Sequence, residues 1–188
     1  MNAVIGSFQS GMSIVNDVNL GFLQKMLLTQ VSRPAILLGR LATDLLMVIV
    51  QSIIIIGIAL ILGLRISSGV SGLLLIFVTI IIFDLAWAGL MLWVGLITKK
   101  AETVSAVGNI LAFPLLFVSS ALFPTAIMPR WAQLISDYNP LSYASNVTRD
   151  LVQGGLTWHT FSVAYAVIII MAIVTFSATL YQFRKVVS

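Results

Sequence analysis

The chain has 188 residues, of which 60% are hydrophobic and only 9% are charged, and it contains no cysteine. A soluble domain carries about 25% charged residues, so ten basic and six acidic side chains are too few to cover a water-soluble globule of this size. This composition excludes a cytosolic enzyme, a disordered tail and a disulfide-rich scaffold. The basic residues lie beside long apolar runs, so the net charge of +4 predicts contact with anionic phospholipid and no binding of nucleic acid.

The first 15 residues are moderately apolar but too few to cross a bilayer, which takes about 20 residues in a helix. They lack the positively charged start and the cleavage site of a signal peptide. We expect them to form the cytoplasmic end of a helix whose beginning lies outside this sequence, as in a truncated reading frame or a fragment of a longer protein.

Residues 16–44 predict a short amphipathic helix, a bend and then a helix that climbs into the membrane. Asn16 or Asp17 is expected to cap the short helix. Three leucines then share one helical face: Leu20, Leu23 and Leu27. Pro34 suits the first turn of the following helix, where its missing amide proton costs nothing. The pattern fits either a helix that lies in the membrane interface or a docking element for a cytoplasmic partner.

Four stretches are long and apolar enough to span the membrane: residues 45–64, 72–97, 104–123 and 161–183. Their β-branched runs do not indicate strands, because a lone segment in lipid must satisfy its own backbone hydrogen bonds. They also lack the alternation of an outer-membrane barrel. The sequence therefore predicts an all-α polytopic bundle, with about four full spans and the end of a preceding one.

Lysine and arginine positions predict the orientation of these spans. If the chain crosses the membrane regularly, seven basic residues lie on one side: Lys25, Arg33, Arg40, Lys99, Lys100, Arg184 and Lys185. Three lie on the other side: Arg65, Arg130 and Arg149. The excess predicts a plasma-membrane protein with a cytoplasmic carboxyl terminus. Arg40 is also expected to pair with Asp44, four residues later on the same helix.

The connection over residues 124–160 is too long for an ordinary loop and predicts short extracytoplasmic helices. Pro129 can open a helix with one apolar stripe, formed by Trp131, Leu134, Ile135 and Tyr138. Asn139 and Pro140 then cap and begin a second helix, which ends at the glycine pair 154–155. This pair of helices either covers the bundle passively or has a gating role.

Asp84 lies near the middle of the second predicted span. A central aspartate costs about 2.5–3.5 kcal/mol on the insertion scale, less than its many apolar neighbours contribute, so the segment still spans. Asp84 therefore lies either on a translocation surface inside the bundle or in a structural hydrogen bond to a serine, threonine or asparagine. The sequence offers no catalytic constellation, because its single histidine, His159, has no partner with suitable spacing and no metal-ligand cluster is present.

The segment before the first complete span resembles a motif of ABC-2 type transporter membrane subunits, a group that includes daunorubicin-type drug exporters and polysaccharide exporters. Asp17 is followed by residues 21–29, read as GFLQKMLLT, and by Val-Ser-Arg at 31–33. The family pattern is D…G-T-L-E-x-L-L-x-T-P-V-S-R. Gln24 replaces the usual acidic residue, and Gln30 stands where proline is common.

Two further motifs resemble the same family and occur in the same order. Residues 114–124, PLLFVSSALFP, begin at Pro114, end at Pro124 and are followed by Met-Pro-Arg-Trp at 128–131. Asn-Pro-Leu-Ser-Tyr then occupies 139–143, with Arg149 and Gly154 behind it. The family has six membrane helices, so the resemblance implies that the first and most of the second are absent from this sequence.

The resemblance implies an ABC-2 permease fold and a permease subunit that forms a homodimer or pseudo-dimer and recruits a separate ABC ATPase. No phosphate-binding loop occurs in this chain, so ATP and Mg²⁺ are expected on that partner and no cofactor on this chain. By the same resemblance, residues 16–33 couple to the ATPase, chiefly through Gly21, Leu23, Lys25, Leu27 and Arg33. The outer gate motifs contain Pro114, Pro124, Pro129, Trp131, Asn139, Pro140 and Arg149.

The expected activity is ATP-driven outward movement of a hydrophobic or amphipathic substrate, such as a drug, a lipid or a lipid-linked glycan. The chain itself is expected to be a transporter subunit and not an enzyme. A different class remains open, in which the chain is a membrane scaffold or a truncated permease without transport activity. Capture of an ATPase by this chain would distinguish the two.

Overall fold

The computed structural model describes residues 2–21, 33–123, 125–155 and 157–187, and these contain helices and turns but no strand. The elements are α1 (Asn2–Asn19), α3 (Arg33–Ile61), α4 (Gly69–Thr98), α5 (Ala101–Phe117), a 3-10 turn (Thr125–Ile127), α6 (Arg130–Tyr138), α7 (Pro140–Gln153) and α8 (Trp158–Val187). The predicted all-α helix bundle is confirmed.

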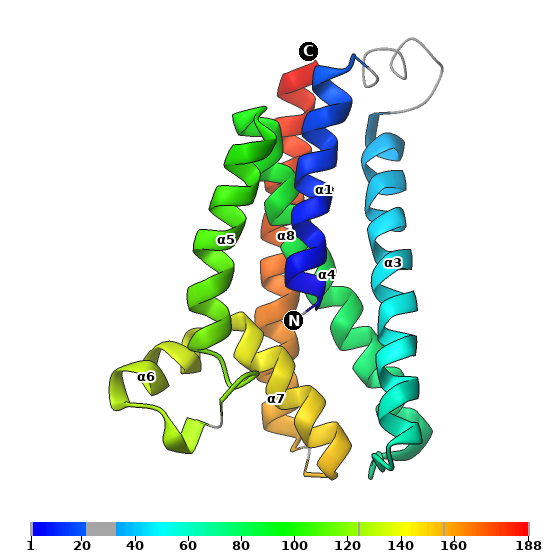
Figure 1. Cartoon of the computed structure of the whole chain (residues 1–188), viewed down its shortest axis with the longest axis vertical. Helices are drawn as coiled ribbons and strands as arrows, with labels where there is room; N and C mark the ends of the chain where they lie inside the picture. The colour runs from blue at the N-terminus through cyan, green and yellow to red at the C-terminus, as the bar shows by residue number, and fades with distance from the viewer. Residues whose placement is uncertain (1, 22–32, 124, 156, 188) are drawn as a thin grey trace.

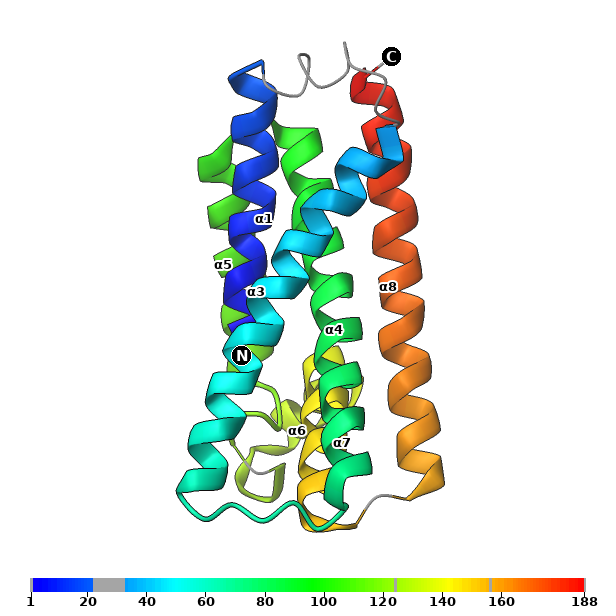
Figure 2. The same cartoon turned by 90° about the vertical axis from the view of Figure 1, so that its right-hand side faces the viewer.

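Helix α4 is the centre of the bundle, and α1, α3, α5, α7 and α8 all pack against it. Figures 1 and 2 show the long helices side by side, with their directions alternating along the chain. One end of the bundle carries the end of α1, the connection between α4 and α5, and the end of α8; we call it the C-terminal end (Figure 1). The opposite end carries the connection 62–68 together with α6 and α7, and we call it the α7 end (Figure 1).

Three of the described helices are long and apolar enough to cross a membrane: Leu38–Ile61, Gly69–Thr98 and Trp158–Phe183. Helix α5 is shorter than the predicted span of 104–123, because it ends at Phe117 and the chain then turns. Pro114 lies within its last turn. Proline cannot donate the helical backbone hydrogen bond, which weakens this turn. The hydroxyl of Ser119 donates to the carbonyl of Leu116 at 2.9 Å, so a side chain satisfies one of the carbonyl groups at the end of α5.

Helix α1 differs from its prediction, because it continues through Asn16 and Asp17 to Asn19. The expected helix cap at these two residues was wrong. The reason is tertiary packing: Ile14 and Val15 are buried against α4, and this contact extends the helix past the capping sequence. The helix ends at Asn19, and the turn after it contains Gly21, whose φ of +68° is a conformation that glycine adopts without a steric penalty.

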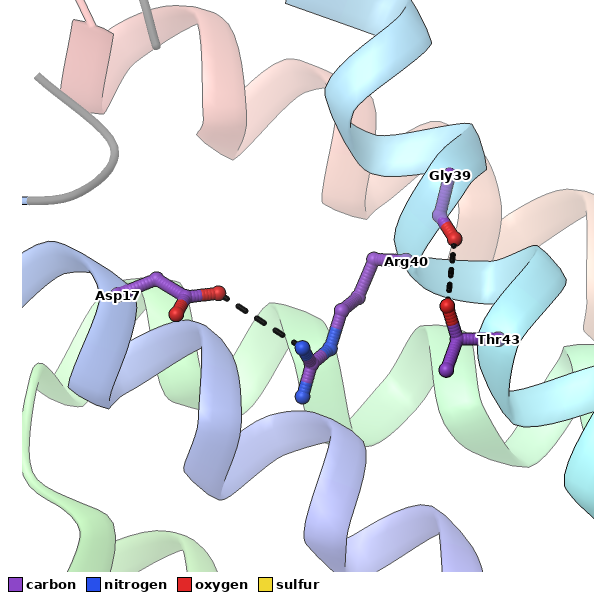
Figure 3. Close-up of polar contacts among 4 residues, drawn as sticks. All are labelled: Asp17, Gly39, Arg40 and Thr43. Atoms are coloured by element: carbon purple, nitrogen blue, oxygen red, sulfur yellow. Dashed lines mark hydrogen bonds and ion pairs between the residues drawn. The ribbon is translucent and has the colours of Figure 1, made fainter. Parts of the chain in front are cut away.

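The observed ion pair of Arg40 is with a residue other than the predicted Asp44, although its charge also acts on the Asp44 carboxylate. Nη1 of Arg40 lies 3.8 Å from Oδ2 of Asp17 on α1, and Figure 3 shows the two side chains pointing toward each other across the gap between α1 and α3. The prediction of an intrahelical pair with Asp44 considered α3 alone. Because α1 runs beside α3, it offers Arg40 a carboxylate from a neighbouring helix.

Candidate functional site

A cavity of about 570 Å³ lies between α3, α4 and α7, in the half of the bundle nearer the α7 end. Its volume falls within the range of about 300–1,000 Å³ that is typical of small-molecule sites. Most of its wall is apolar, formed by Val48, Ile55, Ile56, Ile76, Ile80, Phe83, Ala121, Leu141, Ala144 and Val152. This site can hold a molecule with a substantial hydrocarbon part.

The polar part of the wall comes mainly from α7. The polar residues that line the cavity are Gln51 and Ser52 on α3, Thr79 on α4, and Ser145, Thr148, Arg149 and Gln153 on α7. The hydroxyl of Thr79 is already bonded to the carbonyl of Leu75 at 2.8 Å and to the hydroxyl of Tyr165 at 2.7 Å. The α4 wall is therefore effectively apolar. On α7 the hydroxyl of Thr148 is likewise bonded to the carbonyl of Ala144 at 2.8 Å, and that of Ser145 lies 2.7 Å from the hydroxyl of Ser120. Arg149 and Gln153 are therefore the α7 side chains that present polar groups to the cavity.

Arg149 is held at the edge of this cavity by a hydrogen bond to the turn after α5. Its Nη2 donates to the backbone carbonyl of Ser120 at 2.7 Å. The amide of Ser120 donates to the hydroxyl of Ser142 at 3.2 Å, and the hydroxyls of Ser142 and Ser136 lie 2.9 Å apart. These bonds satisfy the buried polar groups of the turn and fix its position against α7.

The beginning of α7 is built by two residues of the predicted gate motifs. The side chain of Asn139 accepts the amide of Leu141 at 2.9 Å and donates to the carbonyl of Leu115 at 2.7 Å, so one residue caps α7 and joins it to the end of α5. Pro140 is the first residue of α7. The far end of α7 is joined to the α3–α4 connection, because Ser68 Oγ donates to the carbonyl of Leu151 at 2.6 Å.

The structure does not bring all the gate-motif residues to the cavity. Arg149 lines it, and Asn139 and Pro140 begin the helix that forms one wall. Pro114 lies in the last turn of α5, and Pro129 and Trp131 lie at the start of α6, where Trp131 is exposed. Pro124 lies outside the described residues.

Asp84 lies inside the bundle, facing α1 and not lining the cavity. Its side chain is 1% exposed, and the hydroxyl of Ser7 on α1 donates to Oδ1 at 3.2 Å. One turn further along α4, the indole Nε1 of Trp87 donates to the carbonyl of Val4 at 3.1 Å. The structure thus shows the hydrogen bond expected of a structural aspartate.

The two ends of the predicted ATPase-coupling segment lie at the C-terminal end of the bundle. Gly21 follows α1 and Arg33 begins α3. Figure 2 shows the end of α1 and the start of α3 at the same end of the bundle. Leu23, Lys25 and Leu27 lie outside the described residues.

Sequence reasoning missed the cavity because its lining residues come from three helices that are far apart in the chain. Two weak signals were present: the adjacent Gln51 and Ser52 within a long apolar run, and the polar spacing of Ser145, Thr148 and Arg149 on one side of α7. The described residues contain no cluster of three or more histidine or acidic side chains that could hold a metal ion.

A comparison with protein families identifies the architecture. A family model described as ABC-2 type transporter matches residues 1–152, about four fifths of the chain. The chain belongs to the ABC-2 type transporter family. With its apolar helices of spanning length, it is a multi-pass membrane protein of this family. The match includes α3, α4 and α7, the three helices that enclose the cavity.

Curated relatives of the chain are permeases of this family. A daunorubicin resistance ABC transporter permease protein, DrrB1 of Streptomyces coeruleorubidus, is 29% identical over 151 residues, covering 80% of this chain and 53% of the relative. The putative transport permease ycf38 of Pyropia yezoensis is 32% identical over 151 residues, covering 78% and 50%. A probable doxorubicin resistance ABC transporter permease protein, DrrC of Mycobacterium tuberculosis, is 26% identical over 153 residues, covering 81% and 55%. The chain thus spans about half the length of these relatives. No solved structure matches it significantly.

Proposed function

We propose that this chain is the membrane-spanning permease subunit of an ATP-driven ABC-2 type exporter that moves a hydrophobic or amphipathic substrate outward. The observation that carries the proposal is the cavity between α3, α4 and α7, which combines a largely apolar wall with polar groups that come mainly from α7. Membership of the family and the drug-resistance permeases among its relatives support the same function.

The proposed cycle requires an ATPase at the C-terminal end of the bundle, which is then the cytoplasmic end. A partner seated on the segment between Gly21 and Arg33 would pull directly on α3, because that helix begins at Arg33. Since α3 forms one wall of the cavity, its displacement would change access to the site. ATP and Mg²⁺ would bind the partner, and a second permease copy or a related subunit would complete the transporter.

The first experiment co-expresses the full chain with a candidate ABC ATPase from the same organism. It measures both ATPase capture and ATP-dependent uptake of amphiphiles by inverted vesicles. Leu23→Asp and Leu27→Asp should abolish capture and uptake, because they place a charge in the proposed docking segment. Leu64→Asp is the control, because it places the same charge in the exposed connection at the opposite end. An ATPase that is captured equally well by the docking variants would contradict the proposed coupling, and no capture by the wild-type chain would support the scaffold reading.

We also propose that Asp84 contributes to the transport cycle through its contact between α4 and α1. Asp84→Asn keeps an oxygen that can accept the hydroxyl of Ser7, so the amount of protein in the membrane should not change. The transport rate should fall, because asparagine cannot be ionised and the centre of the bundle then has no group that can become negatively charged. Vesicle uptake at equal protein amounts measures this, and an unchanged rate would show that Asp84 has a structural role only.

A further inference from the structure

We propose that the α3–α4–α7 cavity selects amphiphiles with an acidic headgroup, either a carboxylate or a phosphate, and that Arg149 binds that headgroup. This inference names the substrate class of the permease and so rests on the proposed function. The observations that carry it are the charge of the lining residues, the free donors of Arg149 and the opposite character of the α4 and α7 walls.

The charge of the cavity wall is positive. Among the described residues that line it, Arg149 is the single one with a formal charge, and no aspartate or glutamate is present. Asp150 follows Arg149 on α7, but it is not a lining residue and forms no ion pair with Arg149. The ion pair between Arg40 and Asp17 lies away from the cavity.

The guanidinium of Arg149 retains donors for a ligand. It has five N–H groups, and its observed hydrogen bond uses one of them, from Nη2 to the carbonyl of Ser120. That bond restricts the side chain, so less conformational entropy is lost when a ligand binds. The planar guanidinium matches a carboxylate or phosphate in two parallel hydrogen bonds, which makes arginine better suited than lysine to this recognition.

The walls place the two parts of an amphiphile in different positions. Ile76, Ile80 and Phe83 of α4 offer a hydrocarbon surface for an acyl or isoprenoid tail. Gln153 lies one helical turn beyond Arg149 on α7 and adds amide donors beside the headgroup position. A molecule with an ammonium headgroup would face a positive charge without a carboxylate to pair with, so the same cavity disfavours cationic amphiphiles. Daunorubicin and doxorubicin, for which two relatives are named, carry a basic amino group, so the inference separates the substrate class of this chain from those drugs.

The test is equilibrium binding to the purified full chain in nonionic detergent, with no ATPase present. The probes are 11-(dansylamino)undecanoic acid, its uncharged methyl ester and the corresponding dansyl alkylamine, followed by fluorescence titration. Arg149 is exposed, so its pair with a carboxylate is partly screened by solvent, and the acid should bind about two- to fivefold tighter than the ester. The amine should bind most weakly. Equal affinities of acid and ester in the wild-type chain would overturn the inference.

Variants at Arg149 test whether this residue causes the preference for the acid over the ester. Arg149→Gln should reduce the affinity for the acid to that for the ester, whereas Arg149→Lys should keep part of the preference because it keeps the charge. Arg65→Gln is the matched control, since it removes a positive charge at the same end of the bundle from a residue outside the cavity. A preference for the acid that persists in Arg149→Gln would overturn the role of Arg149, and would mean that this arginine serves the membrane interface instead.

Two further measurements keep the result interpretable. The hydrogen bond from Arg149 to Ser120 also holds the turn after α5, so a melting curve of each variant shows whether the fold is kept. If Arg149→Gln does not fold, the ratio of the affinities for the acid and the ester is compared between the wild type and Arg149→Lys, and this comparison decides the question. Displacement of the probe by dodecyl phosphate or by dodecanoate identifies the headgroup, and displacement by dodecylamine to the same extent would contradict the inference. Because no ATP is involved, this binding test fails or succeeds independently of the transport test.

Discussion

The two halves of α4 are packed in different ways. In residues 69–83 the buried positions recur every three or four residues, as expected when a helix buries one face: Gly72, Ile76, Thr79 and Phe83. In residues 84–98 most positions are buried, among them Asp84, Ala86, Trp87, Ala88, Gly89, Met91, Leu92, Val94, Gly95 and Leu96. The first half faces the cavity, and the second half is enclosed by α1, α5 and α8.

Small residues explain the difference between these halves. A Cβ atom on Gly11 would lie 2.5 Å from the carbonyl oxygen of Met91, and one on Gly95 would lie 2.6 Å from the carbonyl oxygen of Gly11. On the other side of α4, the hydroxyl of Thr179 on α8 donates to the carbonyl of Gly89 at 2.7 Å. Backbones that approach this closely form a dense helix interface in lipid. The half enclosed by α1, α5 and α8 is therefore the more densely packed half of α4.

The largest effect is expected from Gly95→Leu, because its side chain would enter the space that the backbone of Gly11 occupies. Overpacking in a core costs about 1–3 kcal/mol, and contact with backbone atoms places this case at or above the upper limit. Gly57→Leu is the control, since a Cβ atom at Gly57 meets nothing within 4 Å. Thermal unfolding in detergent measures both, and equal melting temperatures for the two variants would refute the close packing of Gly95 against α1.

This interface also shows which features could be predicted from the sequence. The all-α bundle follows from apolar segments of spanning length, and the start of α7 follows from Asn139 and Pro140, because both signals are local. The close contact between Gly11 and Gly95 has no local signal, since the two glycines lie on different helices. The partner of Arg40, the continuation of α1 past Asp17 and the cavity itself likewise depend on contacts between distant segments.

Two substitutions by alanine, one in each half of α4, should lower the free energy of unfolding by unequal amounts. Met91→Ala removes a fully buried side chain from the enclosed half and should cost about 2–5 kcal/mol, as large-to-small core changes do. Ile76→Ala removes a side chain that lines the cavity, so it enlarges an existing space and should cost less. Unfolding of the two variants under one condition measures the difference. If Ile76→Ala were the more destabilising change, the half facing the cavity would be the better-packed one.

The smallest effect is expected from the ion pair between α1 and α3. The side chains of Arg40 and Asp17 are 26% and 29% exposed and their charged atoms lie 3.8 Å apart, so the pair should contribute about 1 kcal/mol or less. Arg40→Gln and Asp17→Asn should each lower the melting temperature slightly, and the double variant should lower it no more than the sum of the two. If either change were as damaging as Gly95→Leu, charge pairing would hold α1 in place. The expected small shift instead assigns the position of α1 to the glycine contacts, because these remain intact in both variants.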